Sequence, residues 1–174
     1  MPYELNEHEK RLIEDVARGR QDNNLKHGFT EMKVGDGSFE SVDRNGVAGE
    51  WVASRLLNVS MDLRTEYEDP KQVPKWDLAC FGTIDVKTTT YSNGSLLVPR
   101  HKYPKDLEAI DYYCLVTGDW EEGYMVRGFA KSSDVLQQSN LVAMRKDRPN
   151  VLSYRLFQSE LIPLVEFYNE MYGL

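Results

Sequence analysis

The sequence predicts an α/β fold in which helices flank a central mixed β-sheet. Two helical segments come first, three strand-like segments follow, and two strands, a short helix, a strand and a final helix complete the chain. Elements in this order pack as helices against a sheet. The 174 residues, 41% hydrophobic and 11% aromatic, suffice for one substantial core. We therefore expect a single domain, 1–174, with residues 1–46 as an N-terminal extension of a core over 47–174.

The charge balance of the chain disfavours one class of function. The 21 Lys and Arg residues are outnumbered by 28 Asp and Glu residues, which gives a net charge of −7. A protein that coats nucleic acid needs a broad basic surface, which this composition does not supply. An enzyme that contacts phosphates locally stays open, because a metal site itself needs carboxylates.

The start of the chain, Met1–Leu5, has no basic segment followed by an apolar run, and no stretch of about 18 apolar residues occurs. We expect a cytoplasmic protein without a membrane partner. Cys80 and Cys114 lie in apolar, strand-like runs without the spacing of a metal site, so we expect two reduced core cysteines.

Residues 5–20 are predicted to form the first helix. Their apolar residues recur at helical spacing, and Asn6 followed three residues later by Glu9 is a capping-box pattern. Residues 21–46 are dense in turn-forming residues and show no sustained period, so we expect a long loop there. Loops of this length are usually functional or mobile, and a substrate gate and a disordered segment are both open.

The second helix is predicted over Val47–Val59, which is apolar on more than one face. Such a helix packs between other elements. Glu50 is its only acid and would lie in its first turn, beside Gly49, which allows a neighbouring backbone to approach closely. Two interpretations of Glu50 stay open: it complements the positive end of the helix dipole, or it belongs to a functional site.

Strand patterns dominate the rest of the chain. Residues 62–68 alternate polar and apolar side chains, as on a half-exposed sheet, and residues 111–117 form an apolar run typical of a buried strand. The other expected elements are a hairpin over 75–90, strands over 96–98, 124–130 and 151–157, a short helix from Ser132 or Ser133 to Gln138, a basic loop over 145–150, and a final helix capped by Ser159 in which Leu161, Leu164, Val165 and Tyr168 face inward.

The predicted hairpin over 75–90 carries charged residues where a plain sheet would carry apolar ones. Side chains alternate along a strand, so Asp85 and Lys87 share a face. We expect Gly82 to have a positive φ at the centre of a three-residue loop. That register puts Asp77 opposite Lys87 and diagonal to Asp85. Directly opposite residues lie about 5 Å apart and diagonal ones about 7–8 Å, so the two carboxylates could share one cation beside an ammonium group.

Other common catalytic frameworks are absent from the sequence. It contains no glycine-rich phosphate loop and no Gly-x-Ser-x-Gly motif, which disfavours nucleotide hydrolysis, hydride transfer and serine hydrolysis. His8, His27 and His101 are isolated from one another, whereas zinc catalysis usually needs two or three such ligands.

The predicted elements carry an acid on a buried helix, Glu50, an acid on one strand, Asp77, and an Asp-x-Lys pair on the next strand, Asp85 and Lys87. This pattern resembles the PD-(D/E)XK, or restriction-endonuclease-like, nuclease superfamily. The resemblance covers roughly residues 47–117. There the helix, a three-stranded meander and a further strand follow the order of the family. The second helix of the family would fall on residues 103–109.

The chain departs from the family motif at two positions. Trp76 stands where the motif has proline, and Asp85 stands where glutamate is commoner, which shortens the reach to a metal ion. The resemblance still implies a restriction-endonuclease-like core and a metal-dependent nuclease that hydrolyses phosphodiester bonds, with DNA favoured as the nucleic-acid substrate.

The resemblance also implies roles for individual residues. Mg²⁺ or Mn²⁺ would be bound by Asp77, Asp85 and the carbonyl of Val86, because hard cations prefer oxygen ligands. Glu50 would bind the same ion through water or help to hold a second one. Lys87 would orient and help to deprotonate the attacking water, or stabilise the charge of the transition state. The expected phosphate contacts are Thr89, on the face of Asp85 and Lys87, and more weakly Arg100 and Lys102 of a basic segment.

Two other classes of function remain open from the sequence. The chain could be a catalytically inactive binding or assembly protein on the same fold, or an acidic regulator of a nucleic-acid enzyme. A regulator that imitates nucleic acid would carry its acids in an exposed stripe, whereas Glu50, Asp77 and Asp85 are embedded in apolar segments. A homodimer is also open, because branch-cleaving members of the superfamily usually act as dimers.

Overall fold

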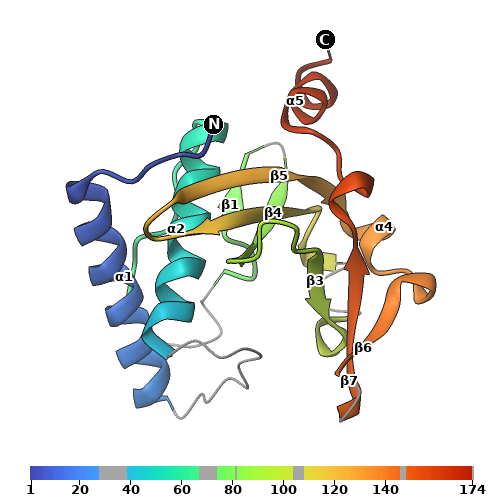
Figure 1. The fold of residues 1–174 in the computed structure, drawn as a ribbon, viewed down its shortest axis with the longest axis horizontal. Coiled ribbons are helices and arrows are strands. Elements are labelled where there is room, and N and C mark those ends of the chain that lie inside the picture. The colour runs from blue at the N-terminus through green and yellow to red at the C-terminus, as the bar shows by residue number, and fades with distance from the viewer. Residues whose placement is uncertain (28–38, 67–73, 81, 104–107, 146–147, 174) are drawn as a thin grey trace.

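Two β-sheets and a pair of long helices make up the structure, a computed structural model that describes residues 1–27, 39–66, 74–80, 82–103, 108–145 and 148–173 (Figure 1). The predicted α/β class with a mixed sheet is confirmed. The described α-helices are α1 (Glu7–Lys26), α2 (Phe39–Leu57), α4 (Ser132–Val135) and α5 (Leu164–Tyr172). The strands are β1 (Leu78–Ala79), β2 (Thr83–Thr89), β3 (Leu96–Pro99), β4 (Tyr112–Asp119), β5 (Gly123–Lys131), β6 (Leu141–Arg145) and β7 (Arg148–Leu156).

The first sheet has the strand order β1-β2-β4-β5. Its central pair, β2 and β4, is parallel, and both outer pairs are antiparallel. The second sheet, β3-β7-β6, is antiparallel throughout. The sequence analysis did not predict this sheet, because it did not identify β6. The expected basic loop over 145–150 is wrong at both ends, since Arg145 belongs to β6 and residues 148–150 belong to β7. Residues 146–147 lie outside the described part.

The first sheet is buried on both faces. Along β4, Cys114 and Val116 belong to the core that α2 covers, while Tyr113 and Leu115 belong to a second core beneath β3 and β7. This alternation follows from the two-residue period of a strand, and burial on both faces explains the continuous apolar run of β4. Charged side chains of the neighbouring strand β2 are therefore held in largely apolar surroundings.

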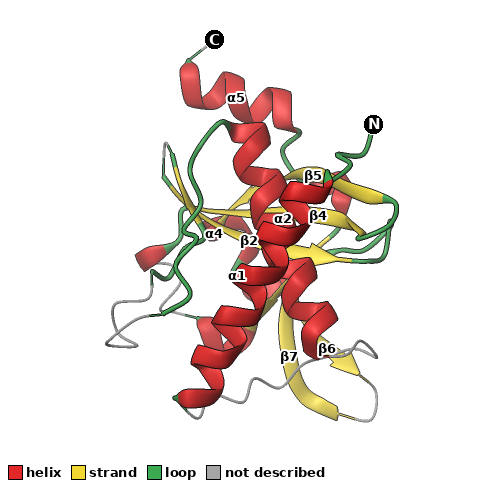
Figure 2. Cartoon of the chain, turned by 90° about the vertical axis from the view of Figure 1, so that its left-hand side faces the viewer, coloured by secondary structure: helices red, strands yellow, loops and turns green. Residues whose placement is uncertain are grey.

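The helices α1 and α2 lie side by side on one side of the first sheet, with α2 between α1 and the strands (Figures 1 and 2). The predicted capping box of Asn6 and Glu9 is confirmed. Both helices extend into the expected loop over 21–46, which is wrong at both ends, while residues 28–38 lie outside the described part. Packing of one helix along the other overrides the turn-forming composition that suggested a loop.

The expected strand over 62–68 is wrong as far as it is described. Only Met61 makes a β-bridge, to Leu78, and residues 62–66 have no regular structure. The side chain of Asp62 accepts hydrogen bonds from the backbone and guanidinium of Arg64, so this alternating stretch satisfies its own polar groups instead of joining the sheet. Of the segment matched to the second helix of the family, Glu108 and Ala109 are helical and residues 104–107 lie outside the described part.

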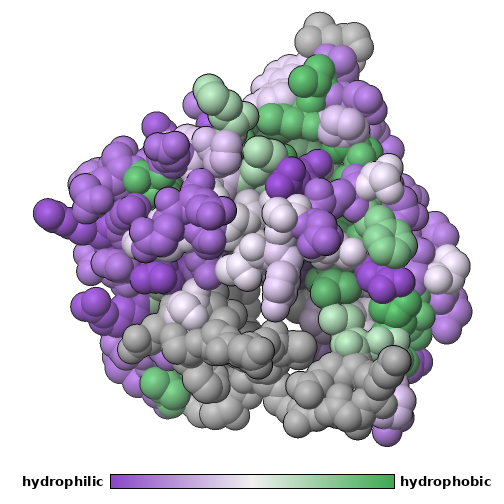
Figure 3. Space-filling view, in the orientation of Figure 1, coloured by the Kyte–Doolittle hydropathy of each residue, from purple (hydrophilic) through white to green (hydrophobic). Residues whose placement is uncertain are grey.

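The C-terminal helix begins later than predicted. Pro163 is its N-cap, and Ser159 lies in a preceding 3₁₀ turn, Gln158–Glu160. Of the residues predicted to face inward, Leu161 is buried and Leu164 and Tyr168 pack against the first core, whereas Val165 is 70% exposed. Phe167, which was not predicted, is buried and stacks on Phe129 with ring centroids 3.9 Å apart. None of the described helices is long and apolar enough to cross a bilayer. In Figure 3 hydrophilic residues dominate the α1–α2 side, and hydrophobic ones gather near α5 and the second sheet.

Candidate active site

The hairpin of β1 and β2 has an even register, as predicted, but a different alignment. Leu78 pairs with Ile84 and Ala79 with Thr83, so that the register continued by one residue aligns Asp77 with Asp85 and not with Lys87. Gly82 does not have the expected positive φ.

Position 82 is occupied by glycine because the side chain of Asp111 leaves no room there for a Cβ atom. A Cβ atom on Gly82 would lie 2.9 Å from Oδ2 of Asp111. That carboxylate accepts hydrogen bonds from the backbone N–H and the hydroxyl of Thr83, at 2.8 and 3.0 Å. The absence of a side chain at Gly82 therefore lets Asp111 fasten the start of β2.

Asp77 lies at the edge of β2, directly before β1. Its backbone N–H donates to the carbonyl of Ile84 at 2.9 Å, and its Oδ2 accepts from the N–H of Val86 at 2.6 Å. Because β1 has only two residues, the Asp77 side chain takes the place of a paired strand at Val86. The N–H and C=O of one strand residue point to the same side, so the carbonyl of Val86 also faces this edge.

Asp85 and Lys87 share one face of β2, as predicted, and form an ion pair. Their neighbours on β4 are Tyr113 and Leu115, which are fully buried. Asp85 is 4% exposed, whereas the side chain of Lys87 is 24% exposed. The ammonium group is thus the part of this pair that solvent or a ligand can reach.

Glu50 lies in the middle of α2, eleven residues after Phe39, so the interpretation as a partner of the helix dipole is wrong. Its Oε2 accepts from Nη1 of Arg20 at 2.8 Å, and Nη2 of Arg20 donates to the carbonyl of Asp62 at 2.7 Å. The side chain of Glu50 is only 13% exposed. Arg20 therefore provides the opposite charge that a buried carboxylate requires.

Gly49 brings α2 close enough to β2 for this arrangement. A Cβ atom at Gly49 would overlap the hydroxyl of Thr88 and lie 3.0 Å from its Cβ. Thr88 belongs to the sheet face that α2 covers, next to Val86, which is part of the first core. The predicted role of Gly49 in close packing is confirmed.

The pKa values indicate that the four predicted catalytic residues lie close together. The pKa of Asp77 is raised to about 8, mainly by burial and also by the negative charges of Glu50 and Asp85, against the opposing effects of Lys87 and the N–H of Val86. Burial also raises the pKa of Glu50, Arg20 lowers it, and the charge of Asp85 raises it. Three neighbouring carboxyl groups are therefore balanced by two cations and by a proton on Asp77.

The donor set fits a hard cation. Carboxylate oxygens and a backbone carbonyl are the ligands that Mg²⁺ and Mn²⁺ prefer. Within the described ranges, no group of three or more His, Cys, Asp and Glu side chains is arranged to hold a metal ion. The hydrogen bonds and ion pairs of Glu50, Asp77 and Asp85 account for this, because each carboxylate is turned towards a protein partner.

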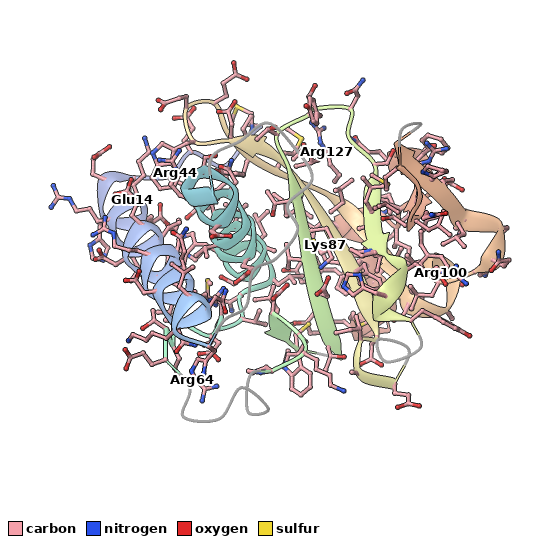
Figure 4. All side chains as sticks on the ribbon, turned by 90° about the horizontal axis from the view of Figure 1, so that it is seen from below. Glu14, Arg44, Arg64, Lys87, Arg100 and Arg127 are labelled. Carbon is pink, nitrogen blue, oxygen red and sulfur yellow. The ribbon has the colours of Figure 1, made fainter. Side chains whose placement is uncertain are left out.

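The predicted substrate contacts are not all brought together. Thr89 ends β2 on the face of Lys87, half-buried and aligned with Thr117 of β4. Arg100 is exposed at the start of the 3₁₀ turn Arg100–Lys102, and Figure 4 places it beyond β3, away from Lys87. The side chain of Lys102 lies outside the described part.

Sequence reasoning missed Arg20, although a signal for it exists. Arg20 follows Ile13, Val16 and Ala17, all buried, at spacings of seven, four and three residues. A charged residue on the apolar stripe of a helix needs a buried partner, and this spacing could have identified it.

Comparison of the chain with protein-family models, with curated proteins and with solved structures found no match.

Proposed function

We propose that the chain is a metal-dependent nuclease that hydrolyses phosphodiester bonds of nucleic acid, with DNA favoured. The observation that carries this proposal is that Glu50 of one helix, and Asp85 and Lys87 of the hairpin, all act on the pKa of the buried Asp77. A buried carboxyl group with a strongly raised pKa, beside two further acids and a lysine, is typical of a catalytic site and is costly as a purely structural feature.

The order of elements supports a restriction-endonuclease-like core. The helix α2, the hairpin β1–β2 and the parallel neighbour β4 follow one another in the chain. In place of the first strand of the meander, the described residues 61–66 provide the bridge of Met61 to Leu78. The site residues nevertheless come from the same elements as in the family.

A bound Mg²⁺ or Mn²⁺ would lower the pKa of a water molecule and offset the negative charge of the reacting phosphate. Asp77, Asp85, the carbonyl of Val86 and Glu50 would hold it. Asp77 has to lose its proton before it can serve as a ligand, because its pKa is about 8. The ammonium group of Lys87, displaced from Asp85, would orient the attacking water and donate a hydrogen bond to the phosphate.

The proposal is tested by incubating the full chain with single-stranded, duplex and branched DNA and with RNA, in Mg²⁺, in Mn²⁺ and in chelator. Cleavage should require the divalent cation. Asp85→Asn and Lys87→Ala should each lower the rate at least about 100-fold. Glu122→Gln serves as a control, because it removes one negative charge from an exposed hairpin turn between β4 and β5. Absence of cleavage on every substrate, together with no calorimetric signal for Mn²⁺, would refute the nuclease.

An inactive binding or assembly protein is the second candidate. It is favoured by the ion pairs of Arg20 with Glu50 and of Lys87 with Asp85, which balance the buried charges without a metal ion. This candidate predicts nucleic-acid binding in chelator and no cleavage in any divalent cation. The same assay therefore separates the two functions.

A further inference from the structure

A β-bulge interrupts the pairing of β4 with β5 beside the candidate site. Leu115 pairs with Gly128 and Val116 with Val126, so Arg127 is an additional residue on β5. Gly128 has a φ of +152°, in the region that favours glycine. Bulges redirect a side chain and are frequent next to functional sites. Here the redirected residue is an arginine.

The bulge directs Arg127 towards a buried threonine of β4. Its Nε donates to Oγ1 of Thr117 at 2.5 Å, and Thr117 is 1% exposed. Thr117 is aligned with Thr89 of β2, which alternates with Lys87 and Asp85 along one face. The guanidinium of Arg127 is thus anchored on the sheet face that carries the ammonium of Lys87.

Half-buried Arg127 forms no ion pair with any carboxylate in the part of the chain that the structure describes. Arg20, Arg64 and Lys131 each form an ion pair with a carboxylate. Arg127 has none there, and its only hydrogen bond to a described residue uses Nε. A guanidinium held by Nε presents Nη1 and Nη2 as a planar fork, the geometry that matches two oxygens of a phosphate.

The distance to Lys87 suits a second phosphate of the same strand. Thr89 lies about 7 Å along β2 from Lys87, and neighbouring strands are about 4.8 Å apart, so the backbone of Thr117, which anchors the guanidinium, is on the order of 10 Å from that of Lys87. This separation exceeds the axial rise of about 3.4 Å between successive phosphates of one strand, so the guanidinium would meet a different phosphate from the one beside Lys87. Figure 4 shows Lys87 and Arg127 between α2 and β3.

We propose that Arg127, anchored by Thr117 and accompanied by the hydroxyl of Thr89, binds another phosphate group of the nucleic-acid strand, near the reacting one. The proposal rests on the proposed function for the identity of the ligand, and it names a contact that requires no metal ion. A purely structural role for Arg127, as a tie between β4 and β5, would use the bond to Thr117 alone and leave strand affinity independent of its charge.

The test measures binding of fluorescein-labelled single-stranded and duplex DNA to the full chain in chelator over a range of salt concentrations. Arg127→Ala and Arg127→Gln should weaken binding at low salt about 3- to 10-fold and make the slope of log K against log salt less negative by about 0.7 for single strands or 0.9 for duplex. Arg127→Lys should retain the wild-type slope. Thr117→Val should retain it too, with weaker binding, because the fork loses its anchor.

Arg11→Ala is the matched control, since it removes the same charge from an exposed position of α1 and should leave the slope unchanged. A wild-type slope in both Arg127→Ala and Arg127→Gln, or no binding of DNA by the wild-type chain, overturns the phosphate contact. A slope that depends on Arg127, in a chain that cleaves no substrate and gives no calorimetric signal for Mn²⁺, supports the contact and refutes the nuclease. Metal-dependent cleavage with a slope independent of Arg127 supports the nuclease and overturns the contact.

Discussion

Asp77 determines the charge of the candidate site near neutral pH. Its pKa is about 8, well above the ordinary value of 3.8, because the carboxyl group is buried and because Glu50 and Asp85 are negatively charged beside it. At pH 7 the group is therefore mostly protonated. A divalent cation can use it as a ligand only after this proton has left, so cation binding and proton release are coupled.

We predict that Mn²⁺ binding at pH 7 releases close to one proton, and that the release falls towards zero above pH 9. The measurement is calorimetric titration in two buffers that differ in ionisation enthalpy. Asp77→Asn should bind Mn²⁺ more weakly and without proton release, whereas Glu122→Gln should behave like the wild type. A heat of binding that is the same in both buffers at pH 7 would contradict this prediction.

The same shift makes stability depend on pH. Since the folded pKa of Asp77 is raised, the folded state binds more protons than the unfolded state between about pH 4 and pH 8. The contribution of Asp77 is therefore favourable below this window and is lost as the pH rises through it. We compare the free energy of unfolding of Asp77→Asn with that of the wild type, both in chelator. The difference should shift in favour of Asp77→Asn by at least about 1 kcal/mol from pH 5 to pH 8, which is the equivalent of one pKa unit.

The check on this second prediction is urea unfolding of both chains at pH 5 and at pH 8. Asn has nearly the shape of Asp and does not titrate, so packing changes cancel between the two pH values. An equal stability difference at both pH values would show that Asp77 titrates normally.

The ion pair of Arg20 with Glu50 should contribute to the stability of the fold. Arg20→Ala leaves the buried carboxylate of Glu50 without its ion pair, and we expect a loss of about 1–3 kcal/mol in the free energy of unfolding, reduced by the partial exposure of Arg20. Arg20→Ala combined with Glu50→Gln should recover most of this loss, because the uncompensated charge is gone. Arg11→Ala is the control in urea unfolding, and a double variant no more stable than Arg20→Ala would contradict the pairing.

At the scale of elements, the contact of α2 with β2 sets the position of Glu50. Gly49 faces Thr88 without room for a methyl group, and the hydroxyl of Thr88 is buried without a hydrogen-bond partner among the described residues. Both features have a cost of their own. A central helical glycine is unfavourable by about 1 kcal/mol relative to alanine, and an unsatisfied buried hydroxyl costs about 1–3 kcal/mol.

Gly49→Ala should nevertheless destabilise the protein. The overlap with Thr88 requires α2 to move from the sheet, at an expected cost of about 1–3 kcal/mol that exceeds the gain in helix propensity. The same movement displaces Glu50, so nuclease activity should fall as well. Thr88→Ala in the Gly49→Ala background should restore part of the stability. Gly46→Ala, where the added Cβ meets nothing within 4 Å, is the matched control in thermal unfolding.

Elements whose signal is local could be predicted from the sequence. The capping box of Asn6, the alternation that unites Asp85 with Lys87, and the apolar run of β4 were all recognised. The extent of α2 and the second sheet could not be predicted, because long-range packing decides them. Residues 39–46 become helical along α1, and β6 exists only through its pairing with β7.

For the candidate site, periodicity identified the acids but not their partners. Asp85 and Lys87 follow from alternation, whereas the alignment of Asp77 with Asp85 depends on the hairpin loop, whose glycine has a different backbone conformation from the one expected. Arg20 and Arg127 come from elements far away in sequence. Their roles depend on α1 packing against α2 and on a bulge in β5, and neither feature has a strong local signature.

At the scale of the whole molecule, α1 belongs to the core that surrounds the site. Ile13, Val16 and Ala17 of α1, with Leu5 just before it, are buried in the first core, and Arg20 of α1 reaches Glu50. The helix α1 is therefore not dispensable for the charge balance of the site.

Deletion of residues 1–27 should abolish cooperative unfolding. The buried side chains of Leu5, Ile13 and Val16 each contribute about 1.5–3 kcal/mol, and the sum approaches the 5–15 kcal/mol that stabilises a typical domain. The full chain with Leu25→Ala is the control, because Leu25 is 62% exposed and its truncation should cost less than about 0.5 kcal/mol. A sharp thermal transition in residues 28–174 would disprove the dependence on α1.

The ion pair of Lys87 with Asp85 has a consequence for the order in which ligands bind. While the carboxylate neutralises the ammonium, an anionic strand meets little net positive charge at this point. Under the proposed function, a cation that engages Asp85 releases Lys87 towards the strand. The two ligands then bind with positive cooperativity, and by thermodynamic reciprocity nucleic acid tightens the hold on the cation by the same factor.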